Sequence, residues 1–160
     1  MPLPYPATIR HGGEGPVIAI VGDTYRILVT GKETGGRYAM WDALVPPGGG
    51  PPPHTHSREE ESFYVLEGEV TFTGEGETFS AGPGTFASMP LGSLHSFRNA
   101  TAKPARMIIS CAPACFEQMF FEAGRILAPG ETAGPPTKEE IEKLLAIAPK
   151  YGVEISVPKH

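Results

Sequence analysis

The sequence predicts an all-β protein built as an antiparallel sandwich or barrel, and three observations support this. Short apolar runs recur along the chain at intervals of about 8–12 residues, and turn residues end each run. Glycine and proline account for 20 and 18 of the 160 residues. This is roughly twice their average share and disfavours long helices, because both residues destabilise them. The 8 Phe, 5 Tyr and 1 Trp argue against disorder, and the length fits a single domain.

The predicted strands follow one another from residue 17 onward. Residues 24–30 are β-branched and aromatic and end at Gly31. In residues 70–73, Val70 and Phe72 alternate with polar residues, which is the period of a half-buried strand. No helix is expected between the strands, which cover residues 17–21, 24–30, 38–45, 63–66, 70–73, 85–89, 95–99, 105–111 and 116–121.

The two ends of the chain differ from this central region. Residues 1–16 are rich in Pro and Gly and lack periodicity, so we expect an N-terminal arm before a β-barrel over residues 17–127. Residues 128–160 are expected to form a linker and a C-terminal α-helix. A capping-box sequence predicts that this helix starts at Thr137. Apolar residues then recur at helical spacing, at Ile141, Leu144, Leu145 and Ala148.

Charge and composition exclude several classes of function. The 13 Lys and Arg residues are scattered among 18 Asp and Glu, so nucleic acid is not an expected partner, because phosphate binding needs clustered cations. No apolar run has the length of a membrane span, and the N-terminus does not have the pattern of a secretory signal. Cys111 and Cys115 are too few for a disulfide framework. A reduced, cytoplasmic protein is expected.

Two histidines, His54 and His56, stand two residues apart after a run of Gly and Pro. In an extended chain, residues at this spacing point to the same side, so both imidazoles can reach one point. Imidazole is the commonest metal ligand and suits Zn, Cu, Fe and Ni. The alternative is two solvated loop histidines, because short motifs also occur by chance.

Other polar residues near this pair leave further alternatives open. Glu59, Glu60 and Glu61 form a run that is typical of a solvated surface, although one of them could be a metal ligand. His95 lies in a predicted strand beside apolar residues. A lone histidine in that setting is more often a core residue than a ligand.

Taken together, the two stretches resemble the two sequence motifs of the cupin superfamily. Every fixed position of the first motif, G-x5-H-x-H-x(3,4)-E-x6-G, is matched by Gly48, His54, His56, Glu61 and Gly68. Every fixed position of the second, G-x5-P-x-G-x2-H-x3-N, is matched by Gly84, Pro90, Gly92, His95 and Asn99. Within this resemblance only Glu61 has the required spacing to Gly68.

The resemblance implies a double-stranded β-helix, the cupin jelly roll, with one divalent transition metal ion per chain. The implied ligands are His54, His56, Glu61 and His95. Fe, Mn, Ni, Zn and Cu all accept such ligands, and an octahedral ion keeps two positions open for substrate, water or O₂. Phe63 and Phe97 each lie two residues beyond a ligand. They are predicted to line the pocket around the metal, with plain core packing as the alternative.

The chain is similar to the quercetin-dioxygenase-like group of single-domain cupins. This similarity implies a metal-dependent dioxygenase that acts with O₂ on a small phenolic or enolic substrate, with Glu61 also accepting the substrate's proton. The alternatives are a metal-dependent isomerase, decarboxylase or lyase, and a non-enzymatic module that binds a small molecule. A homodimer is expected, because the first strands and the C-terminal helix carry apolar surface beyond what the barrel needs.

Overall fold

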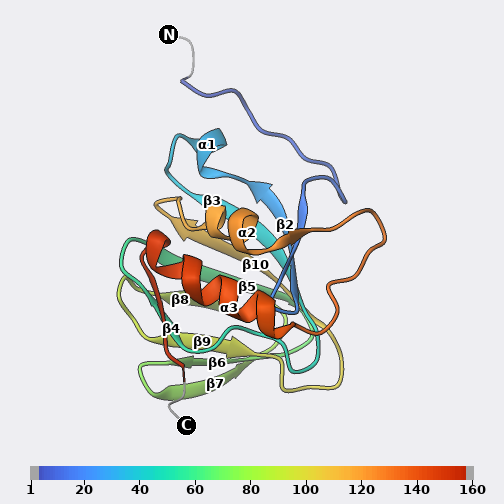
Figure 1. Cartoon of the computed structure of the whole chain (residues 1–160), viewed down its shortest axis with the longest axis vertical. Helices are drawn as coiled ribbons and strands as arrows, with labels where there is room; N and C mark the ends of the chain where they lie inside the picture. The colour runs from blue at the N-terminus through green and yellow to red at the C-terminus, as the bar shows by residue number, and fades with distance from the viewer. Residues whose placement is uncertain (1–3, 158–160) are drawn as a thin grey trace.

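Two antiparallel β-sheets form the body of the protein (Figure 1), in a computed structural model that describes residues 4–157. One sheet has seven strands. In spatial order they are β11 (Arg125–Ile126), β1 (Val17–Ile20), β2 (Asp23–Val29), β3 (Ala39–Val45), β10 (Ala105–Ala112), β5 (Glu60–Glu67) and β8 (Phe86–Met89). The other sheet has five, in the order β12 (Val153–Ile155), β4 (His54–His56), β9 (His95–Arg98), β6 (Val70–Gly74) and β7 (Glu77–Ala81). The predicted all-β jelly roll with a C-terminal helix is confirmed.

The core lies between the sheets and follows from the alternation of side chains along each strand. In β3, Trp41 is 1% exposed whereas Leu44, on the opposite face, is 45% exposed. Phe63 of β5 and Phe72 of β6 are also fully buried and pack ring to ring with centroids 5.1 Å apart. Because these strands belong to different sheets, such contacts join the two layers.

The expectation of a strand at residues 116–121 is wrong, because this segment forms the helix α2 (Glu117–Ala123). Phe116, Phe120 and Ala123 are buried at spacings of four and three residues, which is the period of one helix face and not of a strand. The buried carboxylate of Glu117 fixes the helix start by accepting hydrogen bonds from the backbone N–H groups of Gly31 and Cys115, each at 2.8 Å. A short helix, α1 (Gly31–Thr34), also lies between predicted strands.

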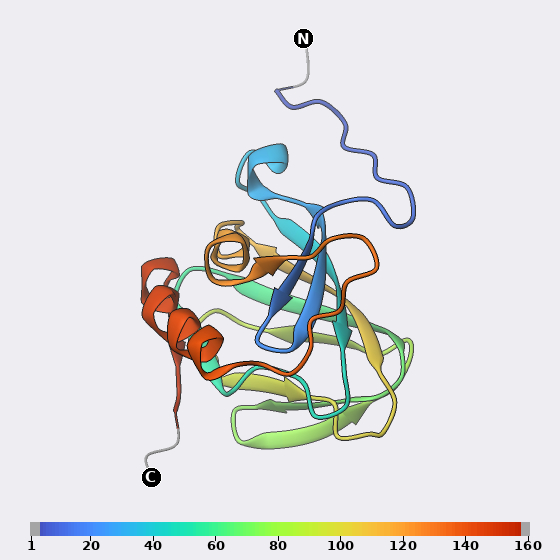
Figure 2. The ribbon, with the colours of Figure 1, turned by 45° about the vertical axis from the view of Figure 1, so that its right-hand side comes forward.

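The C-terminal helix is present as α3 (Lys138–Ile147) and is followed by a 3₁₀ turn, η1 (Ala148–Tyr151). Its capping box forms as predicted, since the Glu140 N–H donates to Thr137 Oγ1 at 3.2 Å and the Thr137 N–H donates to Glu140 Oε2 at 2.7 Å. The helices α2 and α3 pack against each other on the same side of the sheets (Figures 1 and 2).

The sequence does not predict β12, which joins the tail to the body of the protein. This strand pairs antiparallel with β4, and its residues Val153 and Ile155 lie opposite His56 and His54. Gly152 just before it has a φ of 70°, a conformation that favours glycine, and lets the chain turn from η1 into the sheet. The C-terminal segment therefore flanks the strand that carries both histidines of the first motif.

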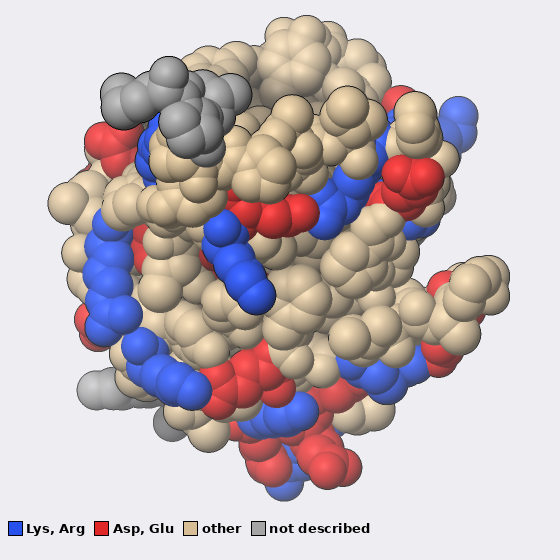
Figure 3. Space-filling view, turned by 90° about the horizontal axis from the view of Figure 1, so that it is seen from above, with Lys and Arg blue, Asp and Glu red and all other residues tan. Residues whose placement is uncertain are grey.

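Charged side chains are intermixed on the surface. Lys and Arg lie among Asp and Glu on the face seen in Figure 3. The best-paired cation is Arg106, which bonds Asp42 at 2.6 Å and Glu67 at 3.2 Å. Exposed pairs of this kind contribute at most about 1 kcal/mol, so core packing dominates stability. Between residues 4 and 157, no helix is long and apolar enough to cross a membrane.

Candidate metal centre

The fold brings the four residues of the two motifs to one place between the sheets. His54 and His56 lie on the same face of β4, and His95 lies on β9 directly opposite His54 in the strand register. Glu61 comes from β5 of the other sheet. One ligand atom from each residue can be chosen so that all four atoms lie within 4.8 Å of one another. This group could hold one metal ion.

Glu61 lies at the centre of the group. Its Oε2 atom is 3.0 Å from Nε2 of His56, 3.0 Å from Nε2 of His95 and 3.9 Å from Nε2 of His54. All four residues are buried. Three imidazole nitrogens and a carboxylate oxygen are therefore held together away from bulk water, which is a donor set suited to a divalent transition metal.

The outer ring nitrogens of two histidines are fixed by backbone carbonyl groups. His54 Nδ1 lies 2.9 Å from the carbonyl oxygen of Pro52, and His95 Nδ1 lies 3.1 Å from that of Ser93. A carbonyl oxygen only accepts, so Nδ1 carries a proton in each of these two rings, and Nε2 is the nitrogen that faces Glu61. Metal-binding histidines are usually oriented by such a bond from the other ring nitrogen.

His56 has a different outer neighbour, the carboxylate of Glu59. His56 Nδ1 lies 3.5 Å from Glu59 Oε2, and Glu59 is 1% exposed. Within the described residues, both nitrogens of His56 and both carboxylate oxygens of Glu59 are buried without a hydrogen bond of good geometry. Buried polar atoms are rarely left so. A cation bound by His56 Nε2 would satisfy that nitrogen, so the residues present fit a metal ion.

Charge in the group is balanced between the imidazoles and the carboxylates. Burial alone would raise the pKa of the Glu61 carboxyl, but the facing imidazoles of His54, His56 and His95 keep this pKa well below its ordinary value. Burial alone would lower the pKa of His56, but Glu59 and Glu61 raise it to about 9. A divalent cation among these atoms would supply the positive charge that the carboxylates otherwise draw from a protonated imidazole.

Sequence reasoning set Glu61 apart from the glutamate run by motif spacing but did not distinguish Glu59 from Glu60, whereas the structure does. Glu60 is exposed, as expected of a solvated residue, while Glu59 is buried against His56. The signal that could have found Glu59 is its spacing. It stands two residues before Glu61, and residues two apart point to the same side of an extended chain.

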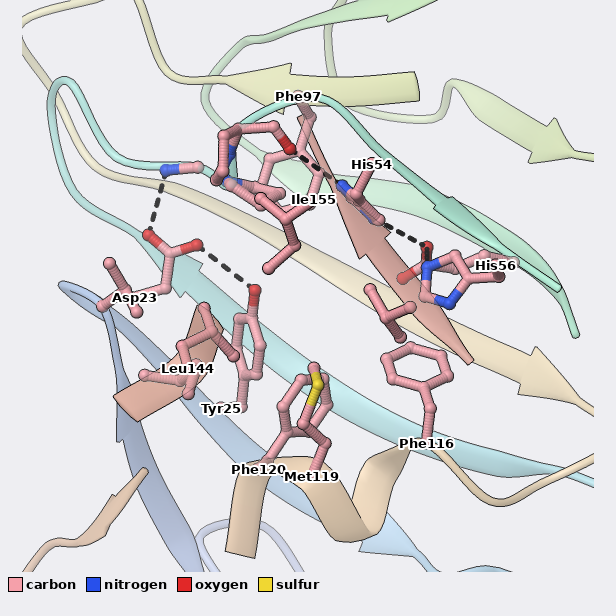
Figure 4. Close-up of a pocket in the computed structure, with 17 residues that line it drawn as sticks. Asp23, Tyr25, His54, His56, Phe97, Phe116, Met119, Phe120, Leu144 and Ile155 are labelled. Atoms are coloured by element: carbon pink, nitrogen blue, oxygen red, sulfur yellow. Dashed lines mark hydrogen bonds and ion pairs between the residues drawn. The ribbon is translucent and has the colours of Figure 1, made fainter. Parts of the chain in front are cut away.

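An apolar pocket with a volume of about 70 Å³ adjoins the metal group. His54, His56 and Glu61 form part of its wall (Figure 4). Phe97, which was predicted to line the pocket, is a lining residue. Phe63 is not among the described residues that line it, and its ring packs in the core, with its centroid 5.7 Å from that of Phe97.

Much of the pocket wall comes from α2, α3 and β12, of which the sequence predicted only α3. Phe116, Met119 and Phe120 enter from α2 and its first turn, and the ring of Phe116 lies 4.4 Å from that of His56 between centroids. Further lining residues come from α3 and β12, namely Leu144, Val153 and Ile155. The two helices and the C-terminal strand thus close the pocket over the metal group.

Asp23 lies in the wall of the same pocket, and sequence reasoning did not single it out. It is 2% exposed and accepts hydrogen bonds from the Gly50 N–H at 3.2 Å and from the Tyr25 O–H at 3.3 Å. Burial raises the pKa of Asp23 to about 7, and the two hydrogen bonds only partly oppose this effect. Burial, together with the charges of Asp23 and Glu61, raises the pKa of Tyr25 well above its ordinary value.

The raised pKa of Asp23 predicts a pH-dependent loss of stability that Asp23→Asn removes. The unfolded chain releases the Asp23 proton near pH 4, whereas the folded protein holds it until about pH 7. The stabilisation due to Asp23 is therefore fully present below pH 4 and is lost as pH rises to 7. The loss amounts to about 4 kcal/mol for a shift of this size.

Urea unfolding of the metal-free parent and Asp23→Asn proteins between pH 4 and pH 8 measures this term. The free energy of unfolding of Asp23→Asn minus that of the parent should increase as pH rises from 4 to 7. Taking the difference between the two proteins cancels the titration of all other groups. Two curves that run parallel over this range would show that the Asp23 carboxyl titrates normally.

The fold and the site together define a class of protein, a jelly roll with a buried three-histidine, one-glutamate group between its sheets. The family model described as "Cupin domain" matches residues 41–111, a range that contains all four residues of the group. The chain belongs to the cupin superfamily.

Comparisons with known proteins identify relatives of several kinds. The chain is 29% identical over 122 residues to quercetin 2,3-dioxygenase from Bacillus subtilis, a match that covers 76% of this chain and 35% of that enzyme. It therefore spans only about a third of that relative. It is 28% identical to the solved structure of the polyketide cyclase RemF from Streptomyces resistomycificus, with a TM-score of 0.52 and coverage of 59% and 67% of the two chains.

A third comparison concerns the fold alone. A predicted oxalate decarboxylase from Thermotoga maritima superimposes with a TM-score of 0.60 at 19% identity. The match covers 67% of this chain and 99% of that structure. The similar proteins thus include enzymes of different reaction classes that share one jelly roll.

Proposed function

We propose that this cupin is a metal-dependent dioxygenase that acts on a small phenolic or enolic substrate. The observation that carries the proposal is the apolar pocket of Figure 4, whose wall includes His54, His56 and Glu61. The apolar wall suits a flat apolar substrate with one oxygen atom facing the metal group, and the wall must move outward to admit it, because the closed pocket holds only about 70 Å³. The similarity to quercetin 2,3-dioxygenase, a named dioxygenase, supports the same reaction class.

In this proposal, His54, His56, Glu61 and His95 hold one divalent transition metal ion per chain. When bound, such an ion supplies Lewis-acid activation of a substrate oxygen and, if it is redox-active, a means of bringing O₂ to the substrate. The three imidazoles bind through Nε2, in the orientation that the carbonyl groups of Pro52 and Ser93 fix for two of them. Phe97 and Phe116 exclude water from the reacting end of the pocket.

Glu61 has a second role in the proposal, as general base. Its Oε2 atom lies among the three imidazoles, and the residue also forms part of the pocket wall. It can therefore reach both the metal position and a hydroxyl proton on a substrate in the pocket. Taking that proton converts a phenol or enol into the electron-rich anion, which is the form that reacts with O₂.

The second candidate function is metal-dependent chemistry without O₂, such as an isomerase, decarboxylase or lyase. The 28% identity to a polyketide cyclase favours this alternative, because that protein carries out a different reaction on the same fold. A third candidate is a non-enzymatic cupin that binds a small molecule. All three use the same metal group and pocket, so only turnover separates them.

Oxygen uptake with a panel of phenols and enols tests the proposal. Protein is loaded with Fe, Mn, Ni, Zn or Cu in turn, and with the metal that supports turnover it is expected to consume one O₂ per substrate converted, with both oxygen atoms in the products. ¹⁸O₂ labelling measures their origin. Conversion that continues without O₂ would replace the dioxygenase by the second candidate. Saturable binding without any conversion would favour the third.

A further inference from the structure

The pocket has a second polar group at the end away from the histidines. Figure 4 shows Asp23 and Tyr25 on one side of the lining residues and His54 and His56 on the other. Asp23 and Tyr25 come from β2, in the seven-stranded sheet, whereas the two histidines come from β4. Between these ends the wall is apolar, with side chains such as Phe120 and Ile155. A ligand that fills the pocket therefore meets polar groups only at its two ends.

Asp23 is an unusual residue for this position. In the described part of the chain it forms no ion pair, and its only hydrogen-bond partners are Gly50 and Tyr25. A buried carboxyl in an apolar setting costs free energy unless it is fully bonded. Its two oxygens accept one hydrogen bond each, from Gly50 and Tyr25. A carboxylate offers about four acceptor sites, so Asp23 retains bonding capacity toward the pocket.

We infer that Asp23 and Tyr25 form a second subsite, which binds a hydroxyl group at the end of the ligand remote from the metal. The inference rests on the proposed function, which directs a first oxygen of the ligand to the metal group. It deepens that proposal by naming the substrate class: an aromatic compound with two hydroxyl groups, separated by a flat apolar body.

A hydroxyl group matches this subsite better than other polar groups. It can donate to a charged Asp23 carboxylate and can accept from the carboxyl if Asp23 is protonated, so it suits either state. A ligand carboxylate would be repelled by the charged form. A ligand ammonium would lose its hydration in a pocket whose remaining wall is apolar.

A competing explanation is that Asp23 only holds the loop before β4 in place. The loop approaches Asp23 closely, since a Cβ atom on Gly49 would lie 2.6 Å from Asp23 Oδ1. In that case, replacing Asp23 would disturb His54 and the metal, and the affinity for every ligand would fall by the same factor. A subsite would instead be sensitive to one ligand hydroxyl only. The two explanations therefore differ in how ligands with one and two hydroxyl groups respond.

The test is a cycle of ligand pairs and variants, measured as equilibrium binding by calorimetry without O₂. The ligands are the three dihydroxybenzenes, the smallest members of this class, each compared with phenol. Asp23→Leu keeps the side-chain size and branching but removes the polar atoms, whereas Asp23→Asn keeps an uncharged polar group. Asp42→Asn is the matched control, because Asp42 lies on the outer face of β3 and pairs with Arg106. Metal content is measured for every protein.

For the metal-loaded parent and the Asp42→Asn control, we expect one dihydroxylated isomer to bind roughly 10- to 100-fold more tightly than its monohydroxylated counterpart, as for a buried hydrogen bond to a charged group. Asp23→Leu should abolish this preference and Asp23→Asn should reduce it. Affinity for the monohydroxylated ligand should stay within about twofold. If Asp23→Leu does not fold, the preference of the parent for dihydroxylated ligands and its reduction in Asp23→Asn still test the subsite.

The outcomes separate this inference from the proposed function. Equal binding of both ligand types by the parent would overturn the subsite and leave the dioxygenase proposal standing. Equal weakening of both types in the Asp23 variants would show that Asp23 only positions the loop, and would also overturn it. A preference that depends on Asp23 in a protein that consumes no O₂ would support the subsite and overturn the dioxygenase. Failure of every phenol to bind would overturn both.

Discussion

The double variant His56→Ala/His95→Ala is expected to lose the metal ion altogether, from about one divalent ion per chain in the parent to none. Both residues face Glu61 Oε2 at 3.0 Å through Nε2, so the change removes two of three neutral donors. Removing only a hydrogen-bond partner of a ligand typically costs 10- to 100-fold in metal affinity. Loss of two ligands should exceed this by far. Elemental analysis of protein purified without an affinity tag measures the effect.

His11→Ala is the matched control, because His11 is exposed and far from the group in sequence, and it should keep the full metal content. Each single variant, His56→Ala or His95→Ala, should bind metal more weakly than the parent. Binding by the parent should weaken as pH falls below about 9, because the pKa of His56 is raised to about 9 in the metal-free group and a protonated ring cannot ligate. A double variant with full metal occupancy would refute the site.

Glu61→Gln is expected to remain about 10²- to 10⁴-fold slower than the parent even when its metal content is restored, which is the usual cost of losing a positioned general base. Glutamine keeps the shape and one oxygen donor but removes the charge and the basicity. If Glu61 were a ligand alone, the loss would lie mainly in metal affinity. Turnover of any substrate found by the panel, normalised to bound metal, separates the two roles.

Glu60→Gln is the control for that measurement. Glu60 is the neighbouring residue on β5 but is exposed, so its variant should turn over at nearly the parental rate. If metal-loaded Glu61→Gln is as fast as the parent, Glu61 is no base. If Glu60→Gln is the damaging change, the assignment of the ligand by motif spacing is at fault.

The sequence predicted those parts of the fold and site that depend on local patterns. Val70 and Phe72 alternate with polar neighbours and do lie in a half-buried strand, and the capping box at Thr137 does start a helix. The four motif residues lie together because their positions on β4, β5 and β9 follow from strand period and register. In each case the signal lies within a few residues of the feature that it predicts.

The parts that were missed depend on contacts between distant segments. Residues 116–121 carry apolar side chains on either side of Glu117 and Gln118, and periodicity alone does not assign so short a segment to a helix or a strand. Its helical start is fixed by the hydrogen bond that the Gly31 N–H donates to Glu117. Residues 153–155 become a strand only because β4 offers a free edge. Asp23 falls between the predicted strands at residues 17–21 and 24–30, and its place in the pocket follows from the packing of two sheets.

The pairing of β12 with β4 has a consequence for how the metal group opens. In the strand register β4 meets β9 only at His54 and His95, whereas β12 pairs with all three of its residues. Strand β12 therefore provides most of the strand pairing that holds β4, which carries His54 and His56. Segments held by few partners open locally before the whole protein unfolds. If β12 detached from β4, His54 and His56 would both become more mobile. We therefore expect a bound metal ion to dissociate faster when β12 separates from β4.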